Sequence, residues 1–160
     1  MHRLAMWWVQ VGAAGLALVL GGLVYALDRG GLPQAQLAGA MAAPWFGAVG
    51  GWLPSLVHPF AFSLITAALR APGAPPAYAA CAAWGLVNVA FELGQHPRVG
   101  PALAARLESA FGPSGVAGAL ADYFSHGRFD SADLAAAVAG AAAAAVWLRA
   151  APHGEDRHAS

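Results

Sequence analysis

Residues 4–27 read LAMWWVQVGAAGLALVLGGLVYAL, a stretch without a charged residue. A helix that crosses a bilayer core of about 30 Å needs roughly 20 apolar residues, so this stretch is long enough to span a membrane. It ends at Asp28-Arg29, where charges reappear. Arg3 before an apolar run is also typical of secretory signal peptides, but their apolar segment has only about 7–15 residues. The length therefore favours an uncleaved transmembrane anchor.

The composition of the whole chain indicates the same class. Of its 160 residues, 59% are hydrophobic and 10% are charged, with eight Arg, no Lys and eight Asp plus Glu. A soluble domain has about 25% charged residues. The absence of a basic excess excludes a nucleic-acid-binding protein, and the single cysteine excludes a disulfide scaffold. The length suits one small bundle without a second domain.

Three further apolar segments predict transmembrane helices over residues 54–69, 77–95 and 131–148. Together with residues 4–27 they predict an all-α integral membrane protein. Its single domain, residues 1–150, is a bundle of about four transmembrane helices, and residues 151–160 form a flexible polar tail. The prolines and glycines of residues 32–52 favour a bent interfacial or re-entrant connection, and an extra span over residues 37–53 is the alternative.

Residues 99–127 carry a different pattern, between the third and the fourth predicted span. Apolar residues recur every fourth position before Gly112-Pro113, as in Leu103, Leu107 and Phe111, and the pattern continues after it. Two short amphipathic helices on the bilayer surface would produce this spacing. An ordinary packed loop is the alternative.

Small residues recur every fourth position in the first and last spans (Ala13, Ala17 and Gly21; Ala136, Gly140 and Ala144). Such rows allow two helix backbones to approach closely in lipid. An alanine-rich composition also produces such rows by chance, so the sequence leaves both interpretations open.

The polar residues of the spans are predicted to meet at one end of the bundle, because the spans are antiparallel. They are His58 in the second span, Asn88, Glu92 and Gln95 in the third, and Asp130 and Asp133 at the start of the fourth. Asn88, Glu92 and Gln95 share one helix face. Polar side chains that face lipid are costly, so we expect them to turn inward. These six residues are the predicted ligand-binding site.

Structural roles are alternatives for several of these residues. Asp130 and Asp133 precede an apolar run, as residues that cap a helix and complement its dipole do. For His58, an interfacial histidine with a satisfied hydrogen bond is the alternative. Glu92 is different, because a carboxyl group inside a span indicates a functional site by default.

No motif indicates a cofactor, a metal or a nucleophile. The chain contains no HExxH, GxSxG, P-loop or GxGxxG motif. Glu92 and His96 are four residues apart on one helix, but this spacing alone is a weak indication of a metal. We therefore expect no cofactor and no metal, assign no catalytic residue, and favour a binding protein over an enzyme.

Three short motifs occur in order along the chain: LPSLVHPF at residues 53–60, NVAFELGQ at residues 88–95, and GRFDSADL at residues 127–134. In this order they resemble the VanZ-like family of small bacterial membrane proteins, which is named after a teicoplanin-resistance protein. The resemblance covers about residues 54–145. It implies a polytopic helical protein of the bacterial cell envelope that influences glycopeptide sensitivity. By position it selects His58, Glu92, Gln95, Asp130 and Asp133.

Three functions are compatible with these observations. The leading hypothesis is a VanZ-like envelope protein that binds a membrane lipid or a lipid-linked headgroup in the polar cluster. The second is a small accessory subunit or homo-oligomer that packs in a larger membrane complex through its Ala/Gly faces. The third is a hydrolase or transferase that uses Glu92 or Asp133. The location is predicted to be the bacterial inner membrane.

The arginines give a weak prediction of orientation. Four of the eight lie on each side of the predicted bundle. Arg106 counts less, because it lies well inside a long loop and only residues close to a span determine orientation. Both termini are therefore predicted in the cytoplasm, with the polar end outside.

Overall fold

The computed structural model describes residues 2–28, 45–70 and 76–150, and these ranges contain helices and their connections but no strand. The four long helices are α1 (His2–Asp28), α3 (Val49–Ala68), α4 (Ala77–Gly94) and α7 (Ser131–Ala150). Two short helices, α5 (Gly100–Phe111) and α6 (Gly115–His126), follow α4 in the chain. The predicted all-α fold is confirmed.

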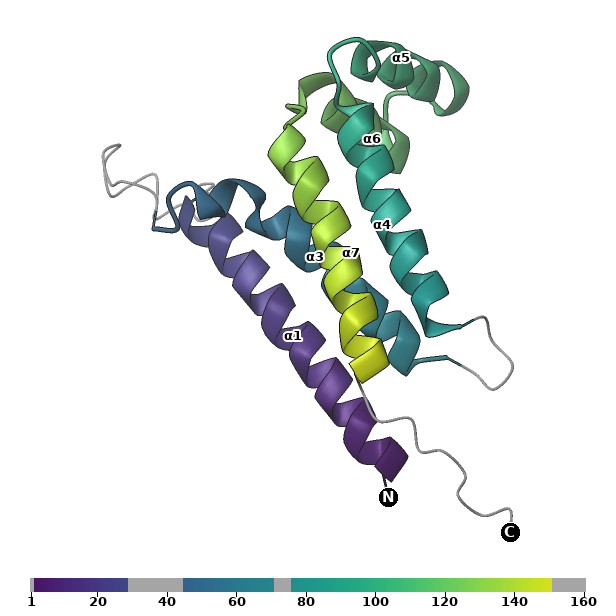
Figure 1. Ribbon diagram of the computed structural model, residues 1–160. Helices are drawn as coiled ribbons and strands as arrows, with labels where there is room; N and C mark the ends of the chain where they lie inside the picture. The colour runs from purple at the N-terminus through teal and green to yellow at the C-terminus, as the bar shows by residue number, and fades with distance from the viewer. Residues whose placement is uncertain (1, 29–44, 71–75, 151–160) are drawn as a thin grey trace.

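Helix α3 lies at the centre of the bundle. It packs against α1, α4 and α7, and α4 also packs against α7 (Figure 1). The end of α1, the start of α3, the end of α4 and the start of α7 lie at one end of the bundle, here called the upper end, where α5 and α6 also lie. The opposite end is called the lower end. The predicted antiparallel arrangement therefore brings the same four helix ends together.

Small residues set the distance between the long helices. Gly140 of α7 is buried, and a Cβ at this position would overlap the carbonyl oxygen of Leu56 in α3. A Cβ on Gly85 of α4 would lie 2.9 Å from the Cβ of Ala141 in α7. The backbones of α3, α4 and α7 therefore approach closely, and the row that contains Gly140 is a packing surface, as small residues allow.

The lower half of the bundle contains the apolar core. Its buried residues come from all four long helices: Ala14, Ala61, Leu64, Cys81, Ala144 and Leu148. Half of them are alanines. Side chains of this size leave little space between helices, and close packing of this kind is what stabilises helix pairs in an apolar surrounding.

Helix α3 begins earlier than predicted, at Val49 instead of Pro54. The reason is a contact between distant parts of the chain. The carboxylate of Asp28 at the end of α1 accepts hydrogen bonds from the backbone N–H groups of Trp45 (2.7 Å) and Phe46 (3.0 Å). These bonds hold a turn over residues 45–48 that leads directly into α3. Of the alternative span over 37–53, residues 37–44 lie outside the described ranges, and residues 45–53 do not form one continuous helix.

Three of the described helical segments are long and apolar enough to cross a membrane: Trp7–Asp28, Ala77–Gly94 and Ser131–Ala150. The prediction of four such helices is wrong for α3, because Pro54, Pro59 and His58 lower its apolar content. Its central position explains this composition, since the surrounding helices cover much of its surface. The predicted tail, residues 151–160, lies outside the described part of the chain.

The two short helices form a hairpin at the upper end. Gly112 and Gly115 in its turn have φ values of +81° and +65°, a region that side chains other than glycine rarely adopt. Phe124 of α6 is buried against the end of α4, where a Cβ on Gly94 would lie 2.5 Å from the ring. The two predicted short helices are confirmed, and α6 rests on the last turn of α4.

Candidate ligand-binding site

The start of α7 is held by two carboxylates. Asp130 Oδ1 accepts a hydrogen bond from the backbone N–H of Ala132 at 2.8 Å, which is an N-cap contact. The N–H of Asp130 itself donates to Glu92 Oε1 at 2.6 Å. Negative groups are stabilised at a helix N-terminus by the helix dipole. The capping alternative for Asp130 is therefore confirmed, and Glu92 connects α4 to the start of α7.

A third carboxylate connects α7 to α3. The hydroxyl of Ser55 donates a hydrogen bond to Asp133 Oδ1 at 2.7 Å. Asp133 lies in the first turn of α7, so its charge also faces the positive end of the helix dipole. One helix start thus carries Asp130 and Asp133 and receives Glu92 from α4, and all three carboxylates accept hydrogen bonds there.

The hairpin contributes a tyrosine to the same region. The side-chain amide of Gln95 donates a hydrogen bond to the Tyr123 hydroxyl at 2.5 Å. The ring of Phe91 lies beside Tyr123, with ring centroids 5.7 Å apart. Gln95 therefore fixes the position of the Tyr123 hydroxyl, and α6 lies against the last turn of α4.

His58 lies deeper than predicted, because α3 begins at Val49 and His58 is its tenth residue. Its ring stacks on Phe62 with centroids 6.0 Å apart, and the ring of Tyr25 from α1 lies 6.5 Å away. Asn88 lies in the third quarter of α4, and its amide donates a hydrogen bond to the carbonyl oxygen of Trp84 at 2.8 Å. Both residues are half-buried.

Two adjoining cavities lie among these groups. The larger has a volume of about 440 Å³ and the smaller of about 80 Å³, and both are lined by Tyr25, Ser55, Glu92, Tyr123 and Asp133. The smaller cavity extends to His58 and Asn88. The larger one extends to Gln95, Arg128 and Asp130. The structure therefore places all six residues selected from the sequence around two cavities that share five lining residues, and their role in binding stays a prediction.

Sequence reasoning missed four lining residues with polar side chains: Tyr25, Ser55, Tyr123 and Arg128. Ser55 precedes His58 by three residues, so helical spacing places both on one face of α3. Tyr123 falls within the apolar pattern that continues after Gly112-Pro113, and a single arginine in a connection between helices is usually a solvated charge. No signal identifies Tyr25, since the predicted span around it is apolar on every side.

The cavity environment acts on Tyr123. Burial raises the pKa of its phenol, the carboxylates of Glu92 and Asp133 add to this, and the hydrogen bond from Gln95 opposes it. The phenol therefore remains protonated at neutral pH and can both donate and accept a hydrogen bond.

Charges of both signs line the larger cavity, with three carboxylates and the guanidinium of Arg128. Asp130 and Asp133 form no ion pair with any other described residue. Nor do His, Cys, Asp and Glu side chains in the described ranges form a group of three that could hold a metal ion. The described side chains that line the cavities can form hydrogen bonds and ion pairs with a ligand.

Comparison of the chain with protein-family models, with curated proteins and with solved structures found no match. The resemblance to the VanZ-like family therefore rests on its three motifs and stays a prediction.

Proposed function

We propose that the chain is an integral membrane protein that binds the headgroup of a lipid, or of a lipid-linked molecule, in the two cavities at its upper end. The observation that carries this proposal is the convergence of polar side chains from five helices on two cavities that share five lining residues. Ligand sites of small molecules typically enclose about 300–1,000 Å³, and the larger cavity, at about 440 Å³, falls within this range.

The outer surface of the bundle supports a position in lipid. Large apolar side chains are exposed along α1, α4 and α7, including Leu16 (75% exposed), Leu86 (68%) and Val146 (66%). Soluble monomers rarely expose contiguous apolar surfaces of such extent. In a bilayer, the same side chains would contact acyl chains at no cost.

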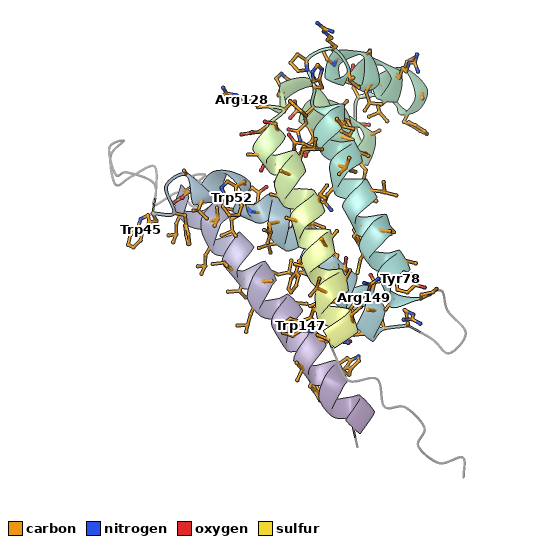
Figure 2. All side chains as sticks on the ribbon, in the orientation of Figure 1. Trp45, Trp52, Tyr78, Arg128, Trp147 and Arg149 are labelled. Atoms are coloured by element: carbon orange, nitrogen blue, oxygen red, sulfur yellow. The ribbon has the colours of Figure 1, made fainter. Side chains whose placement is uncertain are left out.

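Aromatic residues lie at both ends of this apolar surface (Figure 2). Trp45 and Trp52 lie near the upper end of α1, whereas Tyr78 and Trp147 lie near the lower end beside Arg149. Trp and Tyr concentrate at the two interfaces of a membrane. This distribution supports a bilayer that extends between the two levels, with α1, α4 and α7 crossing it around the central α3 and the α5–α6 hairpin at the surface.

We infer the location and the orientation from the sequence. The three VanZ-like motifs support a protein of the bacterial inner membrane that influences glycopeptide sensitivity. The arginine distribution favours both termini in the cytoplasm and the cavities outside. Ser114 lies exposed in the turn of the hairpin and reports the side directly. A Ser114→Cys variant should react with a membrane-impermeant maleimide in intact cells, and reaction only after permeabilisation would reverse the orientation.

Binding is favoured over catalysis by the hydrogen bonds of the carboxylates. Glu92 and Asp133 accept hydrogen bonds from Asp130 and Ser55, and these bonds fix the start of α7 against α4 and α3. Carboxylates that are held in fixed positions by hydrogen bonds can recognise a polar headgroup. The hydrolase or transferase alternative instead requires turnover that a single carboxylate variant abolishes.

Mass spectrometry of the intact protein, released from native membranes in mild detergent, tests the proposal. The wild type should retain lipid, and Glu92→Gln and Asp133→Asn should accumulate normally but retain less. Asp122→Asn is the matched control, because Asp122 lies exposed on α6 and pairs with His126. Equal lipid retention in all four proteins would contradict the proposal. A stable larger complex without lipid would support the accessory-subunit alternative instead.

A further inference from the structure

The charged side chains that line the larger cavity lie at different depths. Asp133 lines both cavities, whereas Arg128 lines only the larger one. Arg128 is exposed in the connection between α6 and α7, beside the start of α7 at the upper end of the bundle (Figure 2). The positive charge therefore lies at the outer part of the cavity and negative charge extends inward from it.

The inner part of the cavity has no arginine or lysine among the described residues that line it, and its one basic side chain is the imidazole of His58. Asp133 uses Oδ1 to accept the hydrogen bond from Ser55, and it has no ion pair within the described ranges. Carboxylates that are partly withdrawn from water are costly without a cation nearby. A ligand that carries a positive group to this position would supply the missing charge and gain a strong, charge-assisted hydrogen bond.

We infer that the headgroup bound in this site carries an ammonium group beside its phosphate, as in phosphatidylethanolamine, with the ammonium at Asp133 and the phosphate at Arg128. This inference rests on the proposed function and specifies its ligand class. A guanidinium suits a phosphate because it offers several donors in a plane. The protonated phenol of Tyr123 and the hydroxyl of Ser55 line the same space and supply further hydrogen-bonding groups.

An anionic headgroup fits this arrangement less well. Phosphatidylglycerol carries the same phosphate but ends in hydroxyl groups, so it would satisfy Arg128 and leave Asp133 without a cation. Its negative charge would also enter a cavity in which carboxylates outnumber the single guanidinium. Like charges at short distance repel strongly where water is scarce. The difference in affinity between the two lipids therefore measures the contribution of the ammonium contact.

The test is a titration of delipidated protein in detergent with phosphatidylethanolamine and with phosphatidylglycerol of identical acyl chains, followed by mass spectrometry of the intact complexes. We expect about tenfold tighter binding of phosphatidylethanolamine, which corresponds to about 1.4 kcal/mol. Asp133→Asn should remove this preference by weakening only phosphatidylethanolamine. Arg128→Gln should weaken both lipids by a similar factor, and the control Asp122→Asn should change neither.

The outcomes separate the inference from the proposed function. Equal affinity for the two lipids would overturn the ammonium assignment while headgroup binding stands. Binding of neither lipid would overturn both. Soluble O-phosphoethanolamine should bind far more weakly than the lipid, and equal affinity would overturn the lipid as the source of the ammonium group. Because Arg128 is exposed, Arg128→Gln keeps the fold, so the phosphate contact remains testable if Asp133→Asn fails to accumulate.

Discussion

The two ends of the bundle are built from different interactions. In the lower half, residues such as Ala61, Leu64 and Ala144 are fully buried, and helices approach through small side chains. At the upper end, the same helices are joined by hydrogen bonds between polar side chains, as between Ser55 and Asp133, and two cavities remain between them. Close packing leaves no space for a ligand, whereas larger polar side chains hold helices apart. The fold thus separates a closely packed apolar scaffold from a polar site that contains two cavities.

The largest effect is expected where the scaffold is tightest. Gly140→Leu places a side chain against the carbonyl oxygen of Leu56, and a backbone atom in the middle of α3 cannot move aside. Overpacking costs about 1–3 kcal/mol where side chains can adjust, so we expect a loss at or above 3 kcal/mol here. Unfolding by SDS in mixed micelles, followed by circular dichroism, measures it.

Ala143→Leu is the matched control for this prediction, because Ala143 is exposed on the same helix. It should change the free energy of unfolding by less than about 0.5 kcal/mol. Similar destabilisation by both variants would show that the contact between α3 and α7 is not the close approach described above.

The helices could be predicted from the sequence because long apolar runs and prolines delimit them. The start of α3 could not, because it depends on hydrogen bonds from Trp45 and Phe46 to Asp28 on another helix. No local pattern contains this contact. The sequence also predicts that α3 is apolar enough to cross a membrane, which is wrong. A central helix that three others cover tolerates polar and proline residues.

The site was partly predictable for a similar reason. Glu92 and Gln95 stood out because polar residues within a span follow one helical face. Tyr25 was not found, because it reaches the cavity only through the rotation of α1 about its axis, and a uniformly apolar helix gives no indication of that rotation. Arg128 belongs to the site through the path of a connection between helices, which sequence spacing does not define.

The next largest effect concerns the polar end. Glu92→Ala removes the acceptor of the Asp130 N–H, and hydrogen bonds to charged groups contribute about 1.5–3 kcal/mol. We expect a loss in this range, whereas Glu92→Gln keeps an acceptor oxygen and loses only the dipole interaction, about 0.3–1 kcal/mol. The same SDS titration compares the two variants. If Gln and Ala are equally destabilising, the contact with the start of α7 does not depend on an acceptor at this position.

A smaller effect is expected for the link between α3 and α7. Ser55→Ala removes the donor to Asp133, but this carboxylate is half-buried and water can replace the hydroxyl, so we expect a loss of about 1 kcal/mol. Ser125→Ala, whose hydroxyl bonds to the Asp122 carbonyl on the exposed surface of α6, should change stability by less than about 0.5 kcal/mol. A Ser55→Ala protein as stable as the Ser125→Ala protein would contradict the structural role of this bond.

The smallest effect is a dependence on alkaline pH that arises only at the polar end. Burial and the nearby carboxylates raise the pKa of Tyr123 above its ordinary value of about 10, so the folded state favours the protonated phenol. This contribution to stability is fully present below pH 10 and is lost as the pH rises through the raised pKa. The thermal midpoint of the wild type should therefore fall above pH 10 more steeply than that of Tyr123→Phe.

Ultraviolet absorbance of the ionised phenol, taken as the difference between the two proteins, should show Tyr123 titrating above pH 10. Removal of a neighbouring charge by Asp133→Asn should shift this titration to lower pH, because one of the carboxylates that oppose ionisation is lost. A difference spectrum that titrates at or below pH 10 would contradict the effect of partial burial and of the Glu92 and Asp133 carboxylates on the pKa of Tyr123.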